Sequence, residues 1–172
     1  MCCVIIGKED KMFREMRRKK QLLSDTQCIE ILQRGTSGVL ALHGDDGYPY
    51  AVPLSYVYDD FKLYFHGAKV GHKIDAIKSC DKASFCVIDQ DIVVPEEYTT
   101  YFRSVIVFGK IRILEDETEK REAIEKLADR YYPDGTESRR EQEIQKAGNA
   151  LCMLEFSIAH ITGKETVRLA KK

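Results

Sequence analysis

Basic side chains gather where a predicted strand meets a predicted helix, in the segment KLYFHGAKVGHKIDAIK of residues 62–78. Lys69, His72 and Lys73 lie at this junction, and two glycines there allow the backbone to approach a ligand closely. The first N–H groups of a helix lack backbone partners and stand at the positive end of its dipole. The segment therefore predicts a phosphate site, although a turn with solvated lysines has the same residue types.

A strip of small side chains precedes this segment, in the predicted strand of residues 48–60, YPYAVPLSYVYDD. Ala51, Pro53 and Ser55 alternate with larger apolar and aromatic residues, so they face the other side of the strand. A planar ligand could lie against them, but so could a packed helix. Pro53 lacks an N–H donor, which predicts an edge strand or a bulge at that position.

His66 is the histidine best suited to chemistry. It shares a strand face with Tyr64, and an imidazole can donate or accept a proton near neutral pH. The alternative is a hydrogen-bonded histidine in the core or at an interface. His43 and His160 are predicted to be structural. No histidine pair has a carboxylate or thiol at metal-ligand spacing, so no metal site is predicted.

Hydrophobic periodicity predicts the elements that position these residues. A capping box over residues 24–27, SDTQ, begins a helix. The strands are expected at residues 38–44, 48–60, 62–68, 82–94, 102–114 and 151–162, and the helices at 25–34, 71–79, 118–132 and 137–150. A polar loop, PEEYTTY, separates the strands 82–94 and 102–114. Six strands without strand–helix–strand alternation predict a mainly β fold, a small antiparallel barrel with flanking helices.

Size and charge narrow the possible functions. The chain has 172 residues and a net charge of -1, which gives no general attraction to nucleic acid or to an anionic membrane. We expect one domain over residues 12–172 and a loose tail over residues 1–11. No apolar run approaches the roughly 20 residues that span a bilayer, and no signal peptide is recognised, so a cytoplasmic protein is expected. Six cysteines without a CxxC pair indicate reduced thiols.

Three stretches together carry a family resemblance: GVLALHGDDGYPYAVPLSYVYDD, KLYFHGAKVGHKIDAIKSCDKASFCVID, and YFRSVIVFGKIRILED with a later ITGK. They resemble the flavin-binding split-barrel proteins related to pyridoxamine 5′-phosphate oxidase, and most of all the 5-nitroimidazole-resistance branch. The resemblance implies a split β-barrel and a homodimer with flavin mononucleotide (FMN) at the subunit interface. The residues that it implies for FMN binding are Val52, Pro53, Leu54, Ser55, His66, Gly67, Ala68, Lys69, Gly71, His72, Lys73 and Ser104.

The phosphate turn departs from the family pattern. The Ser-Arg-Lys turn of the oxidases falls on Gly71, His72 and Lys73, which removes a hydroxyl and a fixed guanidinium. A histidine is charged only part of the time near neutrality, so phosphate binding is expected to be weaker or more dependent on pH. Flavin adenine dinucleotide (FAD), or no flavin, is therefore an alternative to FMN, and haem is a less favoured one.

The resemblance also separates substrates. The chain ends in ITGKETVRLAKK without the Arg-x-His element that holds the substrate phosphate in pyridoxamine-phosphate oxidases, which disfavours vitamin B6 oxidation. The nitroimidazole-resistance branch implies a reductase of nitroimidazoles or similar flat electron-poor compounds, with His66 as the catalytic residue and NAD(P)H or another reductant as electron source. A haem-binding split barrel and a non-enzymatic flavin or redox module are the alternatives.

A homodimer is also expected from the residues themselves. The predicted strands 82–94 and 102–114 contain the apolar runs FCVI, IVV and VIVF. One barrel with few covering helices would leave part of these runs exposed, and a second copy would cover them.

Overall fold

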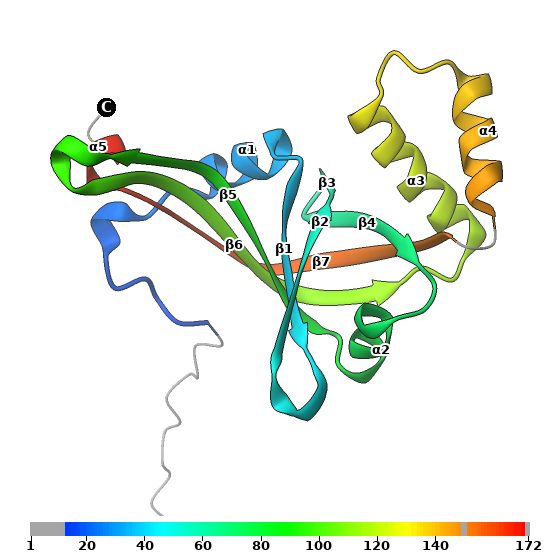
Figure 1. The fold of residues 1–172 in the computed structure, drawn as a ribbon, viewed down its shortest axis with the longest axis horizontal. Coiled ribbons are helices and arrows are strands. Elements are labelled where there is room, and N and C mark those ends of the chain that lie inside the picture. Colours follow the sequence, from blue (N-terminus) through cyan, green and yellow to red (C-terminus); the bar gives the residue numbers. More distant parts are fainter. Residues whose placement is uncertain (1–12, 149–150, 171–172) are drawn as a thin grey trace, which may run out of the picture.

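An antiparallel sheet of seven strands forms the centre of the structure, a computed structural model that describes residues 13–148 and 151–170 (Figure 1). The strands are β1 (Ser37–His43), β2 (Pro49–Ser55), β3 (Val57–Asp59), β4 (Lys62–Ala68), β5 (Lys82–Val94), β6 (Thr99–Ile113) and β7 (Leu151–Glu165). Their order across the sheet is β2-β1-β5-β6-β7-β4-β3. The two edge strands are not hydrogen-bonded to each other, so the predicted mainly β split barrel is confirmed. The predicted tail of residues 1–11 lies outside the described residues.

Helices flank this sheet, and several begin where the sequence predicts (Figure 1). They are α1 (Asp25–Arg34), α2 (His72–Ser79), α3 (Glu117–Tyr131), α4 (Glu137–Ala147) and α5 (Val167–Ala170). The capping box of α1 is present, because the Ser24 hydroxyl accepts from the Gln27 N–H at 3.2 Å and the Gln27 side chain accepts from the Ser24 N–H at 2.9 Å. Within the described residues, no helix combines the length and apolar character needed to cross a membrane.

The prediction of one long strand over residues 48–60 is wrong, because this segment forms two strands at opposite edges of the sheet. β2 pairs with β1, and β3 pairs with β4. Tyr56 separates them. Its side chain is fully buried, its hydroxyl donates to the carbonyl of Leu32 at 2.8 Å, and its N–H donates to the Tyr131 hydroxyl at 3.0 Å. The buried tyrosine turns the chain from one edge to the other.

The β5–β6 connection is also shorter than predicted. β5 has the predicted bounds, but β6 begins at Thr99, so only the first part of PEEYTTY is a loop. Residues Thr99–Tyr101 pair with the end of β5 and lengthen the hairpin. The β-branched threonines fit a paired strand although they are polar.

Aromatic rings fill the centre of the core. Phe85 of β5 is fully buried, and its ring meets Tyr56 at 5.0 Å and Phe65 of β4 at 5.1 Å between centroids. A Cβ atom on Gly38 of β1 would lie 2.5 Å from the Phe85 ring, so only glycine fits there. Phe85 therefore connects β1 and β4, which lie in opposite halves of the sheet.

We expect the Phe85→Ala protein to lose about 3–5 kcal/mol of unfolding free energy, because the substitution leaves a cavity among buried rings. Urea denaturation followed by circular dichroism measures the loss. Tyr48→Ala is the matched control, because Tyr48 is 76% exposed, and it should change the unfolding free energy little. Equal losses in the two variants would contradict the central place of Phe85.

Candidate functional site

The predicted phosphate turn is a helix start without a side-chain cap. Gly71 precedes α2 with φ of 119°, a backbone conformation that favours glycine. The Gly71 carbonyl accepts from the N–H groups of Ile74 and Asp75, and no side chain caps the helix. The N–H groups of His72 and Lys73 therefore point out of the helix start, as an anion site requires.

Lys73 adds a positive charge beside this helix start. Its side chain folds over β4, because a Cβ atom on Gly67 would lie 2.8 Å from the Lys73 Nζ. Lys73 is half-buried, and burial lowers its pKa. Within the described part of the chain, no carboxylate forms an ion pair with it. A half-buried ammonium without an acidic partner is suited to hold an anion.

His72 and Lys69 are placed differently from Lys73. The His72 ring stacks on Tyr50 of β2 at 4.0 Å between centroids, and its Nε2 lies 3.6 Å from the Asp45 carboxylate. The imidazole thus packs α2 against the β1–β2 hairpin. Of His72, only the backbone N–H lies at the helix start. Lys69 is exposed beside a smaller cavity that Lys120 also lines.

The predicted strip on β2 alternates as expected. Val52 and Leu54 pack against the core, whereas Pro53 and Ser55 are exposed. β2 is an edge strand, and Pro53 pairs with Val39 without a bulge, so the edge alternative is the one observed. One edge of the β2 backbone therefore has no strand partner among the described residues and can offer N–H and C=O groups to a ligand.

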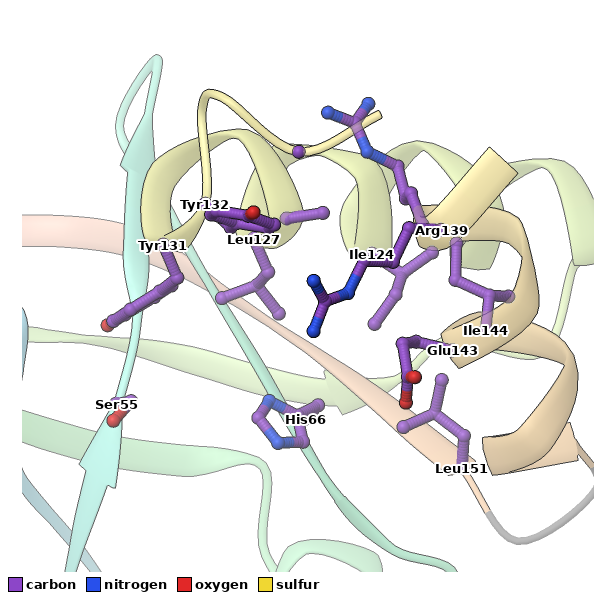
Figure 2. Close-up of a pocket in the computed structure, with 13 residues that line it drawn as sticks. Ser55, His66, Ile124, Leu127, Tyr131, Tyr132, Arg139, Glu143, Ile144 and Leu151 are labelled. Atoms are coloured by element: carbon purple, nitrogen blue, oxygen red, sulfur yellow. The ribbon is translucent and has the colours of Figure 1, made fainter. Parts of the chain in front are cut away.

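Ser55 and His66 meet at one cavity of about 420 Å³ between the sheet and the helices α3 and α4 (Figure 2). His66 lies on β4 and is exposed, so the core alternative is wrong, because a core histidine would be buried. The sheet supplies the floor of the cavity and the two helices supply its apolar wall, to which Leu127 and Ile144 belong. The sequence predicted these helices but not that they cover His66.

Ser104 does not line this cavity. It lies on β6, pairs with Ile88 and Lys164, and shares a sheet face with exposed apolar side chains. Ile88 is 65% exposed and Ile106 is 37% exposed. The predicted flavin contacts are therefore divided within one chain between the cavity, the phosphate turn and this open sheet face.

His160 and the described cysteines have structural surroundings, whereas His43 is exposed at the end of β1 and its structural role stays a prediction. His160 stacks on Phe13 at 4.6 Å between centroids. The described cysteines are free thiols, Cys28 and Cys152 are buried, and burial raises the pKa of Cys28 to about 11. In the described ranges, no group of three His, Cys, Asp or Glu side chains could hold a metal ion.

Comparison with known proteins identifies one family. The profile of the family described as pyridoxamine 5′-phosphate oxidase matches residues 24–165. No curated protein matches the chain.

Solved structures share the fold. A candidate 5-nitroimidazole antibiotic resistance protein from Bacteroides thetaiotaomicron is 20% identical with a TM-score of 0.71, over 84% of this chain and 86% of that one. An FAD-binding protein from Mesorhizobium loti is 25% identical with a TM-score of 0.60, over 85% and 97%. An FAD- and haem-binding protein from Mycobacterium smegmatis is 24% identical with a TM-score of 0.69, over 86% and 73%.

Proposed function

Since the chain belongs to the pyridoxamine 5′-phosphate oxidase family, we propose that it is a flavin-dependent reductase of nitroimidazoles or similar flat electron-poor compounds. The observation that carries this proposal is the route of one strand. β4 presents His66 to an apolar cavity and then leads through Gly67 to the unpaired Lys73 at a helix start. A redox cofactor with a phosphate group fits this arrangement, and the fold of the Bacteroides protein supports the substrate class.

The phosphate of the flavin would bind at the start of α2. Lys73 supplies the charge, and the N–H groups of His72 and Lys73 supply directed donors. The backbone from Gly67 through Lys69 lies beside this point, and the φ of Gly71 sets the turn. FMN is the proposed cofactor, and FAD is the alternative that the Mesorhizobium loti protein supports.

We propose that residues 12–172 form a single flavin-binding domain. Within it, the ring system of the flavin would lie along β2. Pro53 and Ser55 offer small exposed side chains there. Val52 and Leu54 have side chains in the core and pair with β1, so they would hold in place the strand that presents Pro53 and Ser55. A bound flavin would supply electron transfer from NAD(P)H or another reductant to the substrate.

A homodimer would complete this site. Ser104 contributes from a sheet face that holds exposed Val39, Ile88 and Ile106, the kind of surface that a second copy covers. In this arrangement, Ser104 of one subunit would reach the flavin held along β2 and at the phosphate turn of the other. A dimer of this kind would explain why Ser104 lies away from the other predicted flavin contacts of its own chain.

His66 would act on the substrate. Reduction of a nitro group consumes protons as well as electrons, and an exposed imidazole in the cavity can deliver a proton or hold the nitro oxygens. The apolar side chains of α3 and α4 line the cavity beside it.

Haem binding is a second candidate function, because an exposed histidine in an apolar cavity can bind iron and the Mycobacterium smegmatis protein is a binder of both FAD and haem. The absorption spectrum of the purified protein separates the candidates. A flavin absorbs near ~450 nm, and haem has a sharp band near ~410 nm.

Lys73→Ala should weaken flavin binding by about 1–3 kcal/mol, because it removes a charge-assisted contact to phosphate. Fluorescence titration of the cofactor-free protein with FMN measures the change. The control is Lys78→Ala, which removes an exposed lysine from the same helix and should leave the affinity unchanged. If both variants bind FMN as the wild type does, the anion site is refuted.

Sedimentation of the cofactor-free protein at micromolar concentration should show a dimer. Ile106→Lys places a charge on the open sheet face and should shift the protein toward monomer. Val70→Lys places the same charge on a residue that is 81% exposed in the turn before α2 and should leave the dimer intact. A wild-type monomer would contradict the dimer proposal.

The His66→Ala protein should keep its flavin and its oligomeric state but lose most turnover, since general acid assistance is worth about a hundredfold or more. The rate of nitroimidazole reduction per bound flavin is measured with NADH, with NADPH and with a chemical reductant. A normal rate per flavin would remove His66 from catalysis.

A further inference from the structure

Two arginines of α3 and α4 form no ion pair in the described residues: Arg130, whose guanidinium donates to the carbonyls of Arg34 and Gly35, and Arg139. Arg121 pairs with Glu141 at 2.7 Å, and Arg140 pairs with Asp129. These two ion pairs hold α4 against α3. Arg139 instead lies over the ring of Tyr132, with 5.7 Å between its Cζ atom and the ring centroid. Its guanidinium therefore has a cation–π contact but no ion-pair contact in the described residues.

Arg139 belongs to the lining of the cavity that contains His66. The acidic side chain in the same lining, Glu143, has its carboxylate 2.6 Å from the Lys146 ammonium. That hydrogen bond, with the nearby charge of Arg139, lowers the Glu143 pKa. Because Glu143 is paired with Lys146 and Arg140 with Asp129, Arg139 is the arginine of the cavity lining that is left without an ion pair in the described part of the chain.

Most of the other side chains in the lining are apolar or aromatic. Ile124 and Leu127 of α3 and Ile144 of α4 form one wall. The Tyr131 hydroxyl is held by the backbone of Thr36 and Tyr56, so Tyr131 presents mainly its ring to the cavity. A volume of about 420 Å³ is at the small end of ligand pockets and suits a compound of one or two rings.

We propose that this cavity selects flat apolar compounds that carry one carboxylate, with Arg139 as the residue that holds the anionic group. The placement of such a compound against the flavin rests on the proposed function, because Ser55 joins the cavity to the proposed flavin strand. The selection by charge rests on the cavity alone. The ring would lie against the wall of α3 and α4, and its reducible group would face His66.

The test compares 4-nitrobenzoate with 4-nitrobenzamide, which has a similar shape but no charge. Calorimetric titration of the full chain, with flavin and without it, should show that the acid binds about tenfold more tightly, a difference of about 1.4 kcal/mol. Arg139→Gln should abolish this preference and leave the affinity for the amide unchanged. High salt should reduce the preference, because Arg139 is exposed.

Arg168→Gln is the matched control. It removes the same charge from α5, where Arg168 lies 3.6 Å from Glu97 and outside the cavity lining, so the preference for the acid should persist. Thermal unfolding verifies that both variants fold. The proposal is overturned if acid and amide bind equally, if the preference survives Arg139→Gln, or if neither compound binds at millimolar concentration. Flavin titration of the same samples tests the proposed function separately, since the preference can persist in a protein that binds no flavin.

Discussion

The packing of Tyr56 and Phe65 against Phe85 is the contact on which the rest of the structure depends. Tyr56 lies where the chain leaves one edge of the sheet for the other, and its burial in the core places both edges around the same rings. Ser55, the preceding residue, is thereby brought to the cavity of His66 on β4. Without that aromatic contact, Ser55 on β2 and His66 on β4 would lie apart, near opposite edges of an open sheet.

The helical wall of the cavity is also attached to the sheet at Tyr56. Tyr131 at the end of α3 accepts a hydrogen bond from the Tyr56 N–H, and its hydroxyl lies within hydrogen-bond distance of the Thr36 and Tyr56 carbonyls, to one of which it donates its proton. α4 is attached differently, since none of its described side chains is buried and ion pairs join it to α3. Ion pairs between partly exposed side chains contribute little stability. The wall is thus firm along α3 and more weakly held along α4.

Two cations of the candidate site, Lys73 and Arg139, form no ion pair in the described residues. Buried acids elsewhere are neutralised, as Glu155 is by Lys62 and Arg112 at 2.9 and 3.0 Å. Lys73 is half-buried without such a partner, and burial disfavours its charged form. A bound phosphate would offset that cost. Arg139 is exposed rather than half-buried and lines the cavity beside His66, so both charges favour anionic groups in bound molecules.

Local sequence patterns determined the elements of this protein. The capping box, the bounds of β5, the alternation of small and large residues on β2 and the glycine before α2 all depend on neighbours within a few residues. Only the tertiary structure decided that the strand breaks at Tyr56, that the His72 ring stacks on Tyr50, and that α3 and α4 cover His66. These outcomes depend on contacts between residues far apart in the chain, and periodicity carries no information about which distant side chain fills a given space.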